Sequence, residues 1–213
     1  MQLTSSSWAD GARIPAAYAA GKPDAQTTVT FSDNLSPQFA WRELPAGTQS
    51  LALICHDPDV PSRGDDVNQP DREVPASLPR VDFFHWVLVD LPPTLAGLAE
   101  GEFSRGFTPR GKPGPQAAHG ARQGLNDYTG WFAGHAEMAG DYFGYDGPFP
   151  PFNDAIVHRY VFTLYALDVA RLAVEGRFTG AQVRAAMRGH LLAEASFSGR
   201  YTLNPRLAAA AGG

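Results

Sequence analysis

The segment FFHWVLVDL, at residues 83–91, is the clearest strand pattern in the chain, and the two prolines that follow it end the strand. The segment SLALIC at 50–55 is apolar after its first residue, which predicts a central strand buried on both faces. RYVFTLYAL at 159–167 predicts another core strand. Shorter strands are expected at 27–31, 36–41 and 201–203.

One segment has helical rather than strand periodicity. Its apolar face carries Val183, Ala186, Met187, His190 and Leu191. Thr179 is a suitable N-cap, so we expect a helix over 180–194, although Gly189 weakens it by about 1 kcal/mol relative to alanine. Five apolar runs against one helical periodicity predict a mainly β fold with a few short helices, in one domain spanning residues 1–213. The tail, 208–213, is expected to fray.

The composition excludes several classes of function. The net charge is −5, and no basic run could neutralise a row of phosphates, so we expect no nucleic-acid partner. No stretch is long and apolar enough to cross a bilayer. The single cysteine, Cys55, cannot form an internal disulfide, and the N-terminus lacks the basic start and apolar core of a signal peptide. We therefore expect a cytoplasmic location.

Polar, reactive side chains gather at the ends of the expected strands. They are the DPDVP segment at 57–61, His85, Pro150 with Pro151, and the HRY segment at 158–160. His158 and Tyr160 are two residues apart, so they point to one face of their strand, and Arg159 points to the other. An imidazole beside a phenol suits a phosphate or carboxylate oxygen, and His85 could add a third donor.

Asp57 would repel an anion, and two interpretations resolve this. Its carboxylate could fix the tautomer of a histidine, or it could accept a hydrogen from the ligand, either the ammonium of a zwitterion or the remaining proton of a phosphate monoester. A turn-capping role is a third interpretation, because Asp-Pro favours turns. If the histidines are the donors, binding should strengthen as the pH falls from about 8 to 6, where a histidine gains its proton.

Several motifs together resemble the phosphatidylethanolamine-binding protein family, and more narrowly its bacterial Raf kinase inhibitor-like branch. The resemblance runs from about residue 36 to 201. The motifs are DPDVP at 57–61, HWVLV at 85–89, GPFPP at 147–151, HRY at 158–160, YALD at 165–168 and AMRGH at 186–190. Each motif alone is weak, but their presence in this order is specific.

The resemblance implies a β-sandwich with a small pocket at one rim. The ligand contacts it implies are Asp57, His85, Pro150, Pro151, His158 and Tyr160, with Asp59 and Pro61 as structural support. We also expect a cis Val60–Pro61 bond. The implied function is binding of a small anionic or phosphorylated ligand, similar to a phospholipid headgroup, without catalysis, cofactor or metal. The family names suggest regulation of a kinase or protease, and a homodimer is left open. The loops 62–82 and 111–140 are longer than is typical, so we expect them to narrow the pocket or change its ligand.

Two alternatives use the same residues. In a hydrolase, Cys55 would be the nucleophile and His85 or His158 the base; the segment ASFSG at 195–199 does not fit a serine nucleophile motif. In a metal site, Asp57, Asp59, His85 and His158 would be the ligands, although the proline between the two aspartates favours side chains that point apart.

Overall fold

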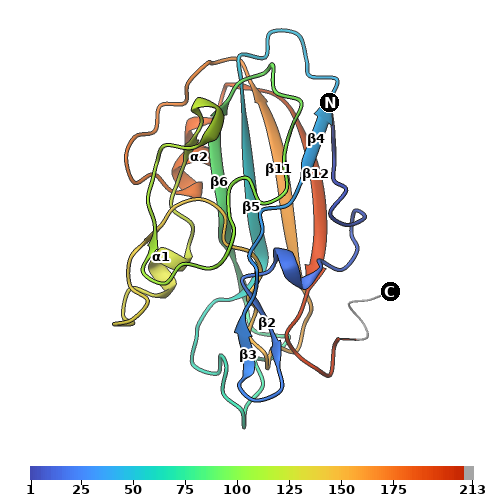
Figure 1. Ribbon diagram of the computed structural model, residues 1–213, viewed down its shortest axis with the longest axis vertical. Helices are drawn as coiled ribbons and strands as arrows, with labels where there is room; N and C mark the ends of the chain where they lie inside the picture. Colours follow the sequence, from blue (N-terminus) through green and yellow to red (C-terminus); the bar gives the residue numbers. More distant parts are fainter. Residues whose placement is uncertain (209–213) are drawn as a thin grey trace.

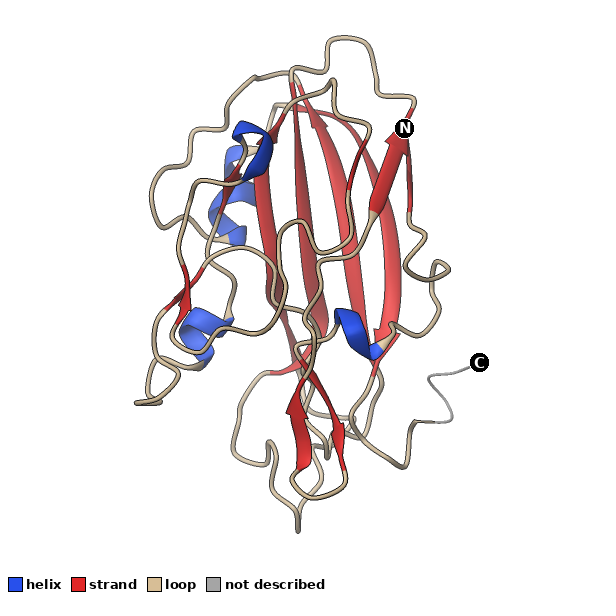
Figure 2. Ribbon diagram, viewed as in Figure 1, coloured by secondary structure: helices blue, strands red, loops and turns tan. Residues whose placement is uncertain are grey.

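A computed structural model describes residues 1–208; residues 209–213, in the tail expected to fray, lie outside the described part. At its centre is a five-stranded antiparallel sheet, whose four long strands lie side by side in Figures 1 and 2. In spatial order the strands are β12 (Leu191–Tyr201), β11 (His158–Leu167), β5 (Ser50–Pro61), β6 (Arg80–Leu91) and β9 (Arg122–Gln123). The three segments with the strongest apolar patterns thus form the adjacent strands β11, β5 and β6.

Both faces of this sheet are covered. On one face lies a smaller sheet of β1 (Gln2–Thr4), β4 (Phe39–Arg42) and β7 (Gly97–Leu98), in which Phe39 and Trp41 pack with Leu53 of β5. On the other face lies α2 (Gly180–Ala186), in which Val183 packs with Ile54 of β5. Leu53 and Ile54 are neighbours, so β5 buries both of its faces, as its unbroken apolar pattern predicted. The mainly β, layered fold is confirmed.

The predicted helix begins where expected but is shorter. Thr179 caps α2 in a capping box with Gln182, because each side chain bonds the backbone N–H of the other residue. The prediction that the helix extends to 194 is wrong. Gly189 adopts a φ of +83°, which takes the chain out of the helical path, and Leu191 already pairs with Leu167 in the large sheet.

The remaining elements are short. β2 (Gly21–Asp24) and β3 (Thr28–Phe31) form a hairpin, and β8 (Gly111–Lys112) pairs with β10 (Asp141–Tyr142) in parallel. The one-turn helix α1 (Tyr128–Trp131) and the 3₁₀ turns Ala16–Tyr18 and Ala118–Gly120 complete the structure. In residues 1–208, no helix is long and apolar enough to cross a membrane.

The DPDVP segment is part of a strand, so β5 extends beyond residue 55, where the apolar pattern ends. β5 continues to Pro61, but its register with β6 shifts between Asp57 and Val60. Asp57 pairs with Phe83 and Val60 pairs with Val81, so β5 advances three residues where β6 advances two. This bulge accommodates Pro58, which has no N–H to donate to a ladder. The predicted cis Val60–Pro61 bond is wrong: within residues 1–208, Gly114–Pro115 is the cis bond. A β-bulge, rather than a cis proline bond, changes the direction of the chain between Asp57 and Val60.

Candidate ligand pocket

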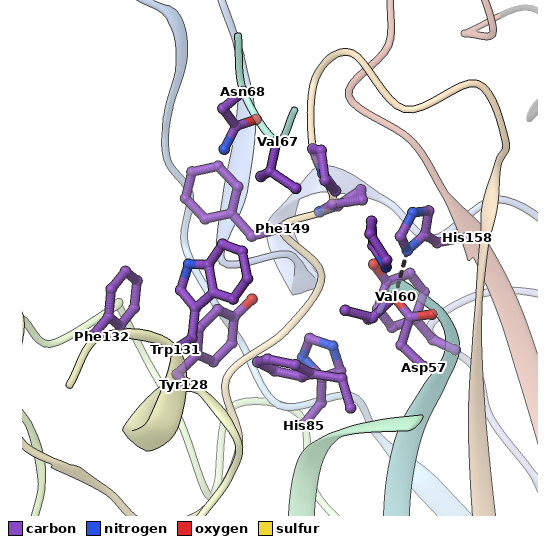
Figure 3. A pocket seen from close by; sticks show the side chains of 15 residues that line it. Asp57, Val60, Val67, Asn68, His85, Tyr128, Trp131, Phe132, Phe149 and His158 are labelled. Atoms are coloured by element: carbon purple, nitrogen blue, oxygen red, sulfur yellow. Dashed lines mark hydrogen bonds and ion pairs between the residues drawn. The ribbon is translucent and has the colours of Figure 1, made fainter. Parts of the chain in front are cut away.

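A pocket of about 130 Å³ opens at the rim of the large sheet where β5 ends and β6 and β11 begin (Figure 3). Antiparallel pairing brings these three strand ends together, although they are far apart in sequence. All six residues expected to contact a ligand line it: Asp57, His85, Pro150, Pro151, His158 and Tyr160. Of the two expected supporting residues, Pro61 lines the pocket, whereas Asp59 does not.

His158 sits between two carboxylates. Its Nδ1 donates to Oδ2 of Asp57 over 2.7 Å, and its Nε2 donates to Oδ2 of Asp154 over 3.0 Å. Carboxylates only accept, so both ring nitrogens carry protons and the ring is an imidazolium. Burial alone would lower the pKa of His158, but the charge of Asp57 and the two hydrogen bonds outweigh it and raise that pKa to about 9. Neither N–H of His158 is therefore left for a ligand.

Arg80 completes this chain of charges. Its guanidinium binds both oxygens of Asp154, over 2.6 and 3.0 Å, and also the carbonyl of Asp59. Burial would raise the pKa of Asp154, but the hydrogen bonds from His158 and Arg80 outweigh it and lower that pKa. Two cations and two carboxylates thus alternate from Asp57 to Arg80, so this wall of the pocket carries little net charge.

His85 is a hydrogen-bond acceptor toward the pocket. Its Nδ1 lies 2.8 Å from the backbone carbonyl oxygen of Asp146, which can only accept, so Nδ1 carries the proton. Burial lowers the pKa of His85 to about 4, against the opposing charge of Asp57. The ring is neutral near pH 7, and its Nε2 offers a lone pair. The expectation that both histidines donate to a ligand does not fit this geometry.

The Tyr160 hydroxyl is a buried donor that lacks a well-aligned acceptor. It is buried beside the Asp57 carboxylate and makes no hydrogen bond of good geometry with any described residue. Burial, reinforced by Asp57, raises the pKa of Tyr160 well above its usual value, so the hydroxyl keeps its proton. Tyr160 and His158 lie on one face of β11 and Arg159 on the other, as their spacing predicted.

Neither alternative chemistry is supported by this arrangement. Cys55 is packed in the hydrophobic core, and burial followed by the charge of Asp57 raises its thiol pKa well above the usual value. Asp59 is turned away from the pocket toward Arg159, with both carboxylate oxygens 2.9 Å from the guanidinium. Among residues 1–208 no group of three or more His, Cys, Asp or Glu side chains is placed to hold a metal ion.

A buried polar network that the sequence did not reveal lies behind His85. The Asp146 carboxylate accepts from Asn34 over 2.7 Å, from Lys112 over 2.9 Å and from Asn126 over 2.8 Å. Burial raises the pKa of Asp146, and the nearby Lys112 opposes that effect. The network holds the backbone carbonyl that fixes the tautomer of His85. The one feature of the sequence that could have indicated this network is Asp146 itself, directly before the GPFPP segment.

The long loops form walls of the pocket. Val67 and Asn68 come from the segment 62–79, and Tyr128, Trp131 and Phe132 come from the segment 111–140. These aromatic walls were not predicted, because nothing local in the sequence places the two loops together. Asp154, the second partner of His158, was also missed, although it lies four residues before that histidine.

Comparisons with known proteins agree with this fold. The family model described as phosphatidylethanolamine-binding protein matches residues 4–202. A UPF0098 protein of Methanothermobacter thermautotrophicus is 33% identical over 201 residues, covering 94% of this chain and 98% of its own. The UPF0098 protein YbhB of Escherichia coli is 31% identical over 170 residues, covering 80% of this chain and 83% of its own.

Solved structures show the same likeness. The crystal structure of a phosphatidylethanolamine-binding protein homologue from Chlamydia trachomatis superposes with a TM-score of 0.62 at 31% identity, covering 94% of this chain and 95% of its own. Escherichia coli YbcL, at 23% identity and a TM-score of 0.65, supports the fold alone. Because the family model spans nearly the whole chain and relatives above 30% identity match it over most of their length, the chain belongs to the phosphatidylethanolamine-binding protein family.

Proposed function

We propose that the pocket binds a small phosphomonoester, of the size of a phospholipid headgroup, in a form that retains a hydrogen on the ligand. The observation that carries this proposal is the Tyr160 hydroxyl, which is buried without a partner of good geometry among the described residues. A buried unpaired hydroxyl costs about 1–3 kcal/mol, and a charged phosphate oxygen would remove that cost by accepting from it.

At the same end of the pocket, the polar atoms of His85 and Asp57 accept rather than donate. His85 presents an unprotonated Nε2, and Asp57 presents a carboxylate. A phosphate dianion has no hydrogen to donate, so its oxygens would be repelled by the His85 Nε2 lone pair and by the Asp57 carboxylate. A monoanion has a P–OH that can donate to one of them, and the ammonium of a zwitterionic headgroup can donate to the Asp57 carboxylate. The volume of about 130 Å³ fits such a group, since a cavity of about 150 Å³ holds benzene.

We propose binding rather than catalysis. Cys55 lies outside the pocket lining, so its thiol is not presented to a ligand. His158 has protons on both nitrogens and cannot act as a base, and a pKa of about 4 makes His85 a weak one. The expected kinase or protease partner has no supporting feature in residues 1–208 and is not part of this proposal.

The test is titration calorimetry with methyl phosphate at pH 6 on the wild-type protein and two matched variants. Tyr160→Phe removes the hydroxyl donor, so affinity should fall about 10- to 100-fold, the effect of a charge-assisted hydrogen bond of roughly 1.5–3 kcal/mol. Tyr165→Phe is the control, because Tyr165 lies on the same strand but packs on the opposite face of the sheet. Equal affinities in all three proteins, with folding intact, would refute the proposal.

A further inference from the structure

The pocket has two chemically different ends. The polar end consists of Asp57, His85, His158 and Tyr160. The mouth, as we call the other end, consists of Val67, Asn68, Trp131, Phe132 and Phe149. In Figure 3, Trp131 and Phe132 lie on the opposite side of the opening from His158 and Asp57. No described residue of the mouth carries a charge.

Trp131 is exposed in a way that the other tryptophans are not. Its exposed fraction is 49%, whereas Trp8, Trp41 and Trp86 are exposed by 8% or less. A large aromatic side chain left half in water beside a pocket is a common feature of binding surfaces, because covering it releases hydration water.

The mouth is held in place from beneath. On α1, the buried Tyr128 donates through its hydroxyl to the carbonyl of Gly147 over 2.9 Å, which ties the helix to the segment before Pro150. Phe132 stacks on Tyr128, with ring centroids 5.7 Å apart and an interplanar angle of 13°. The side of the mouth formed by α1 is therefore anchored to the pocket wall before any ligand arrives.

The other side of the mouth is fixed by a pair of asparagines. Asn153 donates from Nδ2 to the carbonyls of Asp66, Gln69 and Arg72 over 2.7 to 3.1 Å, and its Oδ1 accepts from the N–H of Asn68 over 2.9 Å. Asn68 in turn accepts from the N–H of Phe152 over 3.0 Å. The loop carrying Val67 is thereby fastened to the chain just after Pro150 and Pro151. A Cβ placed on Gly64 of the same loop would lie 3.7 Å from the Trp131 ring, so the loop passes close to Trp131.

We infer that the mouth is a second, apolar subsite, which takes the uncharged alkyl or aryl group of a phosphomonoester whose phosphate occupies the polar end. This inference rests on the proposed function. The pocket volume of about 130 Å³ accommodates a headgroup-sized part of a ligand, so the organic group of a larger ester must extend across the mouth. There it meets aromatic and aliphatic side chains, which favour an apolar group over a charged one.

The experiment compares methyl, butyl and phenyl phosphate by titration calorimetry, with phosphoethanolamine as a ligand whose organic group is cationic. In the wild-type protein, butyl and phenyl phosphate should bind about tenfold more tightly than methyl phosphate, the gain expected when roughly 55 Å² of apolar surface is covered. In Trp131→Ala this ratio should approach one. Leu191→Ala, a control at a residue that is 47% exposed on β12 and absent from the pocket lining, should keep the wild-type ratio.

A measurement without mutation gives a second readout. Because Trp131 is the exposed one of the four tryptophans, acrylamide quenching of fluorescence reports mainly on it. Butyl phosphate should protect it, and methyl phosphate should protect it much less. If methyl, butyl and phenyl phosphate bind with equal affinities and none of them protects Trp131 from quenching, the inference is overturned and the proposed function stands. A loss of phosphoethanolamine affinity in Trp131→Ala as large as the loss of butyl phosphate affinity would also overturn it, because the mouth would then hold a cationic group. Absence of methyl phosphate binding would remove the proposed function, and the inference with it.

Discussion

His158 and Asp57 form a buried ion pair across two neighbouring strands, with Nδ1 of the histidine 2.7 Å from Oδ2 of the aspartate and both side chains 1% exposed. Asp57 reaches this position at the bulge of β5, and its other oxygen accepts from the N–H of Asp59 over 2.8 Å. The pair means that the positive charge in the pocket is already neutralised. Net positive charge therefore does not explain anion binding at this site, and selectivity depends on which pocket atoms donate and which accept hydrogen bonds.

Replacing Asp57 with asparagine should destabilise the fold and lower the pKa of His158. The variant leaves the buried imidazolium with Asp154 as its one carboxylate partner, and the expected loss is about 2–4 kcal/mol of unfolding free energy. Urea unfolding measures the free energy, and an NMR titration of the imidazole measures the pKa. Asp59→Asn is the matched control and should cost less, about 1 kcal/mol, because its partner Arg159 is 60% exposed. Equal losses in the two variants would contradict the buried-pair interpretation.

The two pocket histidines should give the fold an optimum of stability near pH 6.5. The folded pKa of His158, about 9, lies above the unfolded value, so its contribution is complete below about 6.5 and is lost as the pH rises to 9. The folded pKa of His85, about 4, lies below the unfolded value, so its contribution is complete above about 6.5 and is lost as the pH falls to 4. The lowered pKa of His56, caused mainly by burial, acts in the same direction as that of His85.

The measurement is the free energy of unfolding in urea at pH 5, 6.5, 8 and 9. From pH 6.5 to 9 it should fall by up to roughly 3 kcal/mol, since one pKa unit corresponds to about 1.4 kcal/mol. His158→Gln should remove most of that alkaline slope, even though the variant is less stable at every pH. A wild-type stability that rises between pH 6.5 and 9 would show that His158 does not hold its proton in the folded state.

Periodicity was enough to predict the strands that build the pocket. The three strongest apolar segments form the middle of the sheet, and the two-residue spacing of His158 and Tyr160 correctly placed them on one face. Antiparallel pairing then places the polar residues at the strand ends along one rim. The family resemblance named the same residues, and the structure brings all six of them into one pocket.

The chemistry of those residues could not be predicted, because it depends on partners far away in the chain. His85 is an acceptor because of a carbonyl 61 residues later, held by a network that includes Lys112. The strand pattern could not locate the bulge, because the bulge depends on pairing with β6. The helix ended early because pairing of Leu191 with Leu167 outweighed an amphipathic pattern, as tertiary contacts often outweigh local propensity.

Asn153→Ala should loosen the loop that carries Val67. The side chain is 5% exposed and makes hydrogen bonds to three carbonyls and one N–H of residues 66–72, which would be left without these partners. Unfolding free energy should fall by about 1–3 kcal/mol. Hydrogen exchange should speed up for residues 66–72, while the loop 168–179 on the other side of the sheet stays as in the wild type. Unchanged exchange in 66–72 would show that other contacts hold this wall.

Binding of methyl phosphate should strengthen as the pH falls from 8 to 6, and the cause should be the ligand rather than the protein. His158 keeps its proton up to about pH 9 and His85 stays neutral down to about pH 4, so neither changes charge in this range. A phosphate monoester has its second pKa near 6, so the singly protonated form rises from about 1% to about half of the ligand, and affinity should increase by up to roughly 50-fold. That form supplies the P–OH hydrogen that the lone pair of His85 or the carboxylate of Asp57 can accept.

Dimethyl phosphate separates this explanation from titration of a histidine. It carries one negative charge at every pH in the range and has no hydrogen to donate, so its binding should be weak and independent of pH. Calorimetry with both ligands at pH 6, 7 and 8 makes the comparison in one protein. If dimethyl phosphate also binds more tightly at pH 6, a group of the protein is titrating. If methyl phosphate binds more tightly at pH 8, the pocket prefers the dianion, and the assignment of His85 as an acceptor is wrong.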